Sequence, residues 1–436
     1  MPIETPRALL ASLFHAAVRA ADPLEAIRAH LPARPKGRTV VIGAGKAASQ
    51  MALALESLWD GPLEGVVVAR HGPVASCARI TVLQSAHPVP DQAGIVGGRA
   101  LMEAVRGLTT DDLVIALISG GGSALLPSPP PGFALADEVA LNEALLASGA
   151  PISAMNVVRK HVSMIKGGRL AALAHPARVV SLVVSDVPGD NPAFVASGPT
   201  IPDAAGREDA LRAIRDYRMN IPSNILDHIA TGETPRPDDP AFAGHIAHVI
   251  ASARVSLQAA ARLSGETGVT PLILSDRIEG EARDIGRMHA ALAMEFQGRH
   301  RERQGPMVLL SGGETTVTIG PGGADPDGIG PQGIGPHGIG KGGRNTELLL
   351  AAAIDLDGAT GITALAADTD GIDGSEDNAG AFCDGETASR IRAAGGEPRA
   401  HLARHDAWSA FALAGDLFET GPTGTNVNDF RAFLLM

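Results

Sequence analysis

The sequence contains few aromatic residues and few cysteines, and each shortage excludes a class of protein. Only 3% of the 436 residues are aromatic, with one Tyr and two Trp. Surfaces that stack nucleic-acid bases need aromatic platforms, so the composition argues against a nucleic-acid partner. Cys77 and Cys383 cannot form a disulfide framework, and no group of His and Cys has the spacing of zinc ligands.

Positive charge is also scarce, and no apolar run suits a membrane. Acidic residues outnumber basic ones 48 to 36, which gives a net charge of −12. Because such a surface repels polyanions, a phosphate group would have to meet a local basic pocket. Charged residues interrupt the N-terminal apolar residues, and the uncharged stretch 113–136 contains Gly and Pro triplets. We therefore expect no signal peptide and no membrane helix, and a soluble, cytoplasmic protein.

Short β-branched runs alternate with segments of helical period along the whole chain, which predicts α/β architecture. We expect two α/β/α domains, the first with a Rossmann-like, mostly parallel sheet. The predicted strands are 39–42, 65–68, 80–83, 113–118, 179–184, 247–250, 269–274, 307–310 and 362–366. The predicted helices are 48–58, 94–106, 137–147, 153–174, 252–263, 279–296 and 344–354.

Two Pro-rich passages divide the chain. The first, at 231–240, is also acidic, and it places the predicted boundary between an N-terminal domain (1–240) and a C-terminal domain (241–436). The second, at 320–343, repeats Gly-Ile-Gly-Pro. So much Gly and Pro cannot bury a core, so we predict a flexible surface loop there.

The first candidate site is a glycine turn between a predicted strand and a predicted helix. Gly43-Ala44-Gly45-Lys46 would direct backbone N–H groups at an anion, and Lys46 adds a positive charge. The segment lacks the Walker spacing but fits G-x-G-x-x-A, a dinucleotide-binding variant, with Arg70 placed to meet a 2′-phosphate. A tight turn with a solvated Lys46 explains the same residues.

Two further glycine segments follow predicted strands. Ser119–Ser123 contains three glycines between two hydroxyls and can form an anion-binding nest, or a flexible hinge. Ser311-Gly312-Gly313-Glu314 either faces a ligand cleft or forms a hairpin turn. Neither segment has the G-x-S-x-G spacing of a serine hydrolase.

Carboxylates follow the next strand of the first half. Asp186 and Asp190 flank a Pro-Gly turn after the predicted strand 179–184, and a polar segment follows at 196–200. Ligands of α/β proteins bind at the carboxyl ends of strands, so the two acids could hold Mg²⁺ or accept a substrate proton. Turn capping is the alternative, and it explains Asp190 better than Asp186.

The second half carries its own charged segments. Arg344 follows a glycine turn at a helix start, where it could reach a phosphoryl group bidentately or remain a surface side chain. Acids at 368, 370 and 373 follow a predicted strand, but Ala379 occupies the place of the EF-hand glutamate. These acids could bind a magnesium–nucleotide or a polyol, or form only an acidic turn.

Three weaker signals complete the set. His87 lies between Ala86 and Pro88, and a packed histidine is the commoner explanation for it. The residues Arg159, Lys160 and Lys166 form a basic patch around one helix, which is either a solvated face or suited to anionic substrates. The polar segment 421–429 either donates hydroxyls to a cleft or is an exposed tail.

Taken together and in this order, the motifs resemble the class II glycerate kinase family, whose C-terminal part is the MOFRL domain. The similarity covers nearly the whole chain and depends on segments 43–46, 119–123, 185–190, 196–200, 342–345, 368–374 and 421–428. The resemblance implies ATP-dependent phosphorylation of D-glycerate to 2-phosphoglycerate, with the active site between two α/β domains. It also implies that Lys46 and Arg344 are functional.

Phosphoryl-transfer chemistry then suggests roles for these residues. Lys46 and Arg344 would stabilise phosphate charge, and Asp186 or Asp190 would orient the glycerate hydroxyl or hold Mg²⁺. The other expected substrate- or nucleotide-binding residues are Gly43, Gly45, Ser119, Gly120, Gly121, Gly122, Ser123, Ser197, Gly312, Gly313, Asn345, Asp368, Asp370 and Thr423. An NADPH-dependent hydroxypyruvate reductase and a non-catalytic binder of sugar acids are the alternatives.

Overall fold

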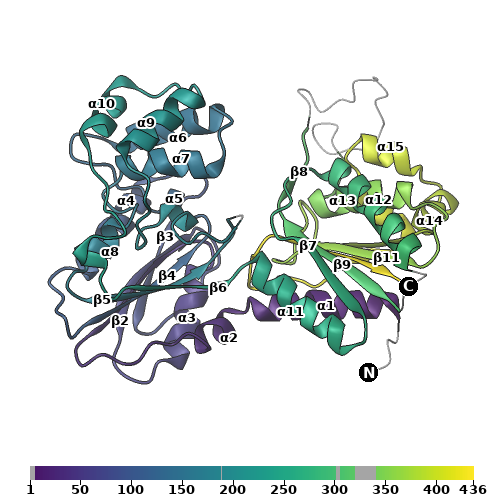
Figure 1. The fold of residues 1–436 in the computed structure, drawn as a ribbon, viewed down its shortest axis with the longest axis horizontal. Helices are drawn as coiled ribbons and strands as arrows, with labels where there is room; N and C mark the ends of the chain where they lie inside the picture. The colour runs from purple at the N-terminus through teal and green to yellow at the C-terminus, as the bar shows by residue number, and fades with distance from the viewer. Residues whose placement is uncertain (1–4, 188, 301–304, 320–339) are drawn as a thin grey trace. The chain divides into compact units, whose positions relative to one another are not determined.

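The computed structural model describes residues 5–187, 189–319 apart from 301–304, and 340–436, and the chain divides into two units. Pro23–Ala251 forms the unit that we call the parallel-sheet unit, while Met1–Asp22 and Ser252–Met436 form the mixed-sheet unit (Figure 1). The division differs from the predicted domains, because the first 22 residues join the C-terminal unit and the boundary follows Ala251. Most of the predicted Gly/Pro loop at 320–343 lies outside the described residues.

The parallel-sheet unit contains a six-stranded sheet of order β3-β2-β1-β4-β5-β6, in which all neighbours are parallel. This is the Rossmann strand order, with its switch point between β1 and β4. The strands are β1 Thr39–Ala44, β2 Glu64–Arg70, β3 Ile80–Ser85, β4 Leu113–Ser119, β5 Arg178–Val184 and β6 Ile246–Ala251. The central strands β1 and β4 are buried along their whole length, as their uninterrupted apolar sequences predict.

Helices cover this sheet and also form a separate layer. The helices nearer the sheet are α2 Pro23–Arg28, α3 Ala48–Leu58, α4 Gln92–Ala104, α5 Gly122–Leu125 and α8 Arg169–Leu173. The layer consists of α6 Leu135–Ala147, α7 Ile152–Arg159, α9 Arg207–Asp216 and α10 Ser223–Thr231, which cluster together in Figure 1. It has its own apolar core, which includes Leu145, Val158 and Ile225.

The single helix predicted over 153–174 is wrong, because the structure breaks it. α7 ends at Arg159 and continues as a short 3-10 turn (η1, Lys160–Val162), and α8 starts only at Arg169. Gly167 and Gly168 have φ values of 63° and 83°, and two successive left-handed residues cannot continue an α-helix. Two other 3-10 turns are η2 Val195–Ser197 and η3 Pro240–Phe242.

The mixed-sheet unit has a sheet of order β13-β12-β11-β14-β9-β7, in which only the β7–β9 pair is parallel. The strands are β7 Thr270–Ser275, β9 Met307–Gly313, β11 Ile362–Asp368, β12 Gly380–Asp384, β13 Leu417–Phe418 and β14 Asp429–Leu435. A separate pair joins β8 Gly280–Glu281 to β10 Thr315–Thr316. The C-terminal strand β14 is buried along its whole length, whereas the polar segment 421–428 before it is exposed at Gly421, Pro422 and Gly424.

Side chains that alternate along β9 explain why the N-terminal residues belong to this unit. Leu309 faces a core with α12 Ala282–His300, α13 Arg344–Asp355 and α16 Ala407–Ala414. Its neighbours Val308 and Leu310 face α1 Pro6–Ala20 and α11 Ala253–Glu266. Since α1 covers part of one sheet face, removing it would expose that apolar core. The remaining helices are α14 Thr387–Ala393 and α15 Pro398–Ala403, and no described helix is both long and apolar enough to cross a membrane.

Candidate functional site

The glycine turns after β1 and β4 lie together at the switch point of the parallel sheet. The Lys46 N–H donates to the Gly120 carbonyl (2.9 Å), and the Ala47 N–H donates to Ser119 Oγ (3.1 Å). Gly45 has a φ of 138°, and a Cβ there would lie 2.0 Å from Ser119 Oγ. The two turns therefore fit only because Gly45 has no side chain.

Asp186 completes this arrangement from the end of β5. A Cβ on Gly120 would lie 1.8 Å from Asp186 Oδ2, so the carboxylate packs directly over the glycine turn. Asp190 lies on the turn that follows and has a φ of 55°. Ala196 and Ser197 also have positive φ values, of 53° and 59°. Such strained non-glycine residues gather where the surrounding structure holds a functional loop in place.

The contact between Gly120 and Asp186 leads to a prediction. We expect Gly120→Ala to lower catalytic activity at least about 10-fold, because the new methyl group must displace the Asp186 carboxylate from the glycine turn. Gly98→Ala in α4 is the matched control, since the nearest atom would be 3.4 Å away and Ala favours a helix by about 0.5–1 kcal/mol. Steady-state kinetics and thermal melts of both variants test this, and equal activities would contradict it.

Positive charge gathers beside these turns. Lys46 is exposed and forms no ion pair among the described residues, and its Cγ lies 3.2 Å from where a Gly121 Cβ would be. The His87 ring lies 3.1 Å from the same position. Burial, together with the nearby charges of Lys46 and Arg70, lowers the pKa of His87. A neutral His87 and two cations form the local basic pocket that the acidic composition requires for an anion.

A hydroxyl–amide network continues from the second glycine turn. Ser123 Oγ and Ser197 Oγ are 3.0 Å apart, and Ser197 Oγ donates to Asn156 Oδ1 (3.1 Å). Asn156 Nδ2 donates to the Phe194 carbonyl, which connects α7 to the strained segment around Ser197. Sequence reasoning selected the two serines and missed Asn156, because a helical Asn has no local signature.

A second cluster lies in the mixed-sheet unit around Arg344. Its guanidinium donates from Nε to Asp429 (2.8 Å), from Nη2 to Asp368 (2.6 Å) and from Nη1 to Glu314 (3.0 Å). Sheet register creates this arrangement, because Asp429 pairs with Gly313 on one side and Asp368 on the other. Arg344 is therefore an ordered side chain and not a solvated one.

Burial and neighbouring charges together shift the pKa values of Arg344 and Asp368. Burial alone would lower the pKa of Arg344, but Asp429 and Asp368 outweigh it and raise the pKa further. Burial, with the charges of Asp370 and Asp429, raises the pKa of Asp368 to about 8 despite Arg344. Arg431, which is fully buried, bonds to the other Asp429 oxygen at 2.5 Å. Sequence reasoning missed Asp429, Glu314 and Arg431 as parts of this cluster.

Several residues that the sequence singled out also form hydrogen bonds within this part of the fold. Asp373, fully buried, accepts from the N–H groups of Asn345 and Thr346 and so caps the start of α13. The Asn345 side chain donates to Asp429 (2.9 Å). The Thr423 hydroxyl donates to the Thr369 carbonyl, and its N–H donates to the carbonyl of Asp370. These bonds hold the 368–374 turn against the segment before β14.

The Ser311-Gly312-Gly313 segment lies inside β9 and is not a hairpin turn. Ser311 Oγ bonds to His289 Nε2 (2.8 Å) in the core, and the Gly312 carbonyl accepts from the Ile278 N–H (2.9 Å). A Cβ on Gly313 would lie 2.3 Å from Ile278 N. The close approach of these backbones accounts for the glycine.

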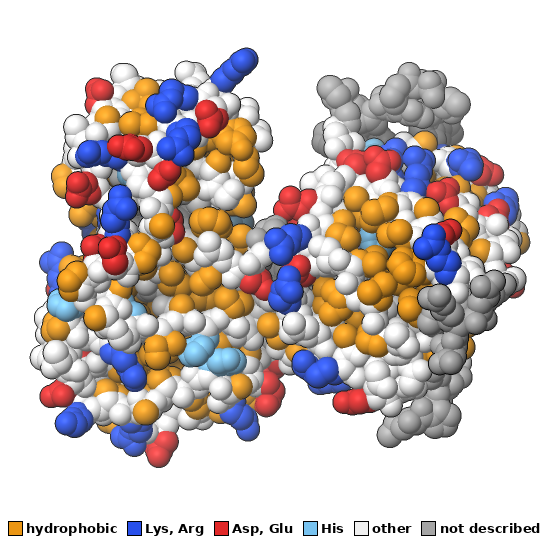
Figure 2. Space-filling model, viewed as in Figure 1, with side chains coloured by type: hydrophobic (Ala, Val, Ile, Leu, Met, Phe, Trp, Pro, Cys, Tyr) orange, Lys and Arg blue, Asp and Glu red, His pale blue; other side chains and the backbone are white. Residues whose placement is uncertain are grey.

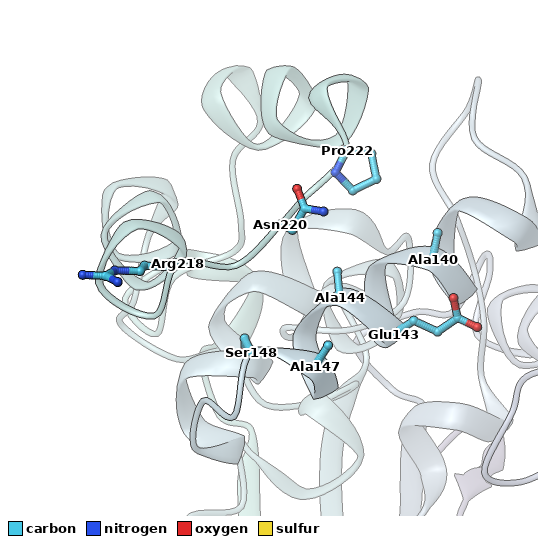
Figure 3. Close-up of a pocket in the computed structure, with 8 residues that line it drawn as sticks. All are labelled: Ala140, Glu143, Ala144, Ala147, Ser148, Arg218, Asn220 and Pro222. Atoms are coloured by element: carbon cyan, nitrogen blue, oxygen red, sulfur yellow. The ribbon is translucent and has the colours of Figure 1, made fainter.

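Within the described ranges, no three His, Cys, Asp or Glu side chains are grouped so as to hold a metal ion. Mg²⁺ commonly uses one or two carboxylates together with substrate phosphates, so this does not decide the prediction for Asp186 and Asp190. A hollow of about 400 Å³ lies elsewhere, in the helical layer, with Ala140, Ala144 and Ala147 along one wall (Figure 3). It includes none of the residues predicted to bind substrate.

Comparisons with known proteins identify relatives of the whole chain. The family model described as "Domain of unknown function (DUF4147)" matches residues 9–230, and the MOFRL family model matches residues 307–429. A D-glycerate 2-kinase of Thermotoga maritima is 37% identical over 442 residues, covering 99% of each chain. The crystal structure of a glycerate kinase from the same organism covers 98% of this chain and 99% of its own, at 35% identity and a TM-score of 0.86. A protein of Agrobacterium vitis named "Putative hydroxypyruvate reductase" is 48% identical, covering 98% of this chain and 94% of its own.

Proposed function

The chain belongs to the class II glycerate kinase family, and we propose that it transfers a phosphoryl group from ATP to the 2-hydroxyl of D-glycerate. The observation that carries this proposal is the group of residues at the carboxyl ends of β1, β4 and β5. There, the glycine turns, the carboxylate of Asp186 and the cation Lys46, which has no ion pair among the described residues, come together. Phosphoryl transfer needs this combination, because charge spreads over the phosphoryl oxygens as the bond breaks.

Each of these groups, and the cation Arg344 of the mixed-sheet unit, has a task in this chemistry. Lys46 stabilises the charge of the transferring phosphoryl group, and the free N–H groups of the glycine turns hold phosphate or carboxylate oxygens. Arg344 is the second cation that the family resemblance assigns to phosphate charge. Asp186 either orients the attacking hydroxyl or holds Mg²⁺, which would neutralise phosphate charge when bound. The Asp186 carboxylate fits either task, because it packs against the turn that would hold the phosphates.

The reductase alternative rests on two observations. The Rossmann strand order is one that binds dinucleotides, and the relative from A. vitis carries a reductase name. The His–carboxylate pairs in the described residues, such as His71–Asp91, do not include His87, which lies at the glycine turns. The residues at the glycine turns therefore favour the kinase over the reductase. The cytoplasmic location remains a prediction from the sequence.

A pair of assays on the purified protein tests the proposal. We expect ATP consumption that requires both D-glycerate and Mg²⁺, and no NADPH oxidation with hydroxypyruvate. Phosphorus NMR of the product should give the 2-phosphoglycerate signal. A 3-phosphoglycerate signal would refute the position of transfer, and NADPH oxidation without ATP consumption would refute the kinase.

A further inference from the structure

Arg159, at the end of α7, is a half-buried cation with no carboxylate partner among the described residues. Its Nε donates to Asn142 Oδ1 (2.7 Å) and its Nη1 to Asn156 Oδ1 (3.2 Å). Both partners are neutral amides, and Nη2 has no hydrogen-bond partner in the described part of the chain. Burial lowers the pKa of Arg159, and only the more distant charge of Glu138 opposes this effect.

The neighbouring cations of the same basic patch are all compensated. Lys160 Nζ pairs with Asp203 at 2.5 Å, and Lys166 pairs with Glu138. Glu138 also accepts from the Ser128 N–H, so its two oxygens are engaged away from Arg159. Arg159 is half-buried, and none of its nitrogens is among the buried atoms that lack a partner, so the part of its guanidinium that the amides leave unused is open to an anion from solution.

The network around Asn156 connects Arg159 to the glycine turns. Asn156 Oδ1 accepts from both Arg159 Nη1 and Ser197 Oγ, so these two groups lie within two hydrogen-bond lengths of each other. Ser123 Oγ is one further bond away. The face of the helical layer seen in Figure 2 carries acidic and basic side chains intermingled, with no broad basic patch on that face.

We propose that Arg159 binds the carboxylate of the substrate, with Ser197 and Ser123 beside it. The assignment rests on the proposed function, which makes the substrate a 2-hydroxy acid. The Nε–H and one Nη1–H of the guanidinium already donate to amide oxygens. The other Nη1–H and the Nη2–H groups form its outer edge and can still donate to a planar carboxylate. Lys46 remains the cation for the phosphate group, so the phosphoryl group and the substrate carboxylate each have a separate cation.

Arg159→Gln tests this assignment, with Arg212→Gln as the matched control. Arg212 lies on α9 of the same helical layer and is exposed, and Asp209 is its one ion-pair partner in the part of the chain that the structure describes. We expect Arg159→Gln to raise the KM for D-glycerate about 10- to 100-fold, because that is the effect of losing a hydrogen bond between charged groups. The KM for ATP should stay within about threefold of its original value. Methyl D-glycerate, which lacks the negative charge, should be used equally by Arg159→Gln and the unaltered protein. The control should change neither KM.

A second measurement on the unaltered protein keeps the proposal testable if Arg159→Gln fails to fold. Phenylglyoxal labels accessible arginines, and peptide mapping should show that D-glycerate protects Arg159 while ATP alone does not. An unchanged KM for D-glycerate in folded Arg159→Gln, or labelling that glycerate does not reduce, would overturn the assignment alone. Protection by ATP alone would assign Arg159 to a nucleotide phosphate instead. If the unaltered protein consumed no ATP with glycerate, the proposed function itself would fail.

Discussion

Lys46→Ala should lower kcat/KM for glycerate-dependent ATP consumption at least about 10²-fold, which is the scale of one preorganised charge-stabilising group. Lys46 is exposed and forms no ion pair with any described residue, so its removal takes away no contact that holds the fold. Its backbone bond to Gly120 is independent of the side chain and will persist. The loss should therefore appear in catalysis and leave the melting temperature nearly unchanged.

Lys36→Ala provides the matched control for this prediction. Lys36 is also exposed and precedes β1, so it lies at the amino end of the strand whose carboxyl end leads to Lys46. Ligands of parallel α/β sheets bind at carboxyl ends, so losing the charge of Lys36 should leave kcat/KM within about twofold. Folded Lys46→Ala with activity like that of Lys36→Ala would remove Lys46 from the mechanism.

The parallel-sheet site was predictable because its signals are local in sequence. The sequence of an apolar strand, a glycine turn and a helix occurs at 39–48 and again at 113–123. The structure places both glycine turns at one switch point of the sheet. The Rossmann order brings together the ends of β1, β4 and β5, which is why Asp186 meets Gly120. The strand bounds agreed to within a few residues, since uninterrupted β-branched runs have few other stable conformations when buried.

The parts that sequence reasoning missed depend on long-range pairing. Asp429 looked like part of a polar tail, but its role arises from its register opposite Gly313 and Asp368. No local pattern shows that α1 packs against α11, more than two hundred residues away, through bonds such as Ser256 Oγ to the Ala17 carbonyl. The sequence left the patch of Arg159, Lys160 and Lys166 as either a solvated face or a site for anionic substrates, and only the three-dimensional partners separate Arg159 from the two lysines.

Arg344→Lys should lower kcat about 10²-fold even though it keeps the positive charge. The guanidinium reaches Asp429, Asp368 and Glu314 with three different nitrogens, and a single ammonium cannot occupy those positions together. Asp429 is fully buried, so it fixes the Nε side, whereas Glu314 is half-exposed and forms a weak ion pair. If Arg344 acts on phosphate charge, as we propose, a phosphoryl group would replace Glu314 at Nη1 while Asp429 keeps the guanidinium aligned. Lysine would lose that alignment.

Arg390→Lys separates this catalytic loss from a loss of stability. Arg390 lies in the same unit and is likewise held by three carboxylates, Asp384, Asp416 and Glu386. Its side chain is 30% exposed, close to the 25% of Arg344. The two substitutions should lower the melting temperature by comparable amounts, because each removes a guanidinium from a similar carboxylate cluster. Only Arg344→Lys should reduce kcat, measured well below both melting temperatures. Equal kcat values for the two variants would show that Arg344 stabilises the mixed-sheet unit without acting on phosphate charge.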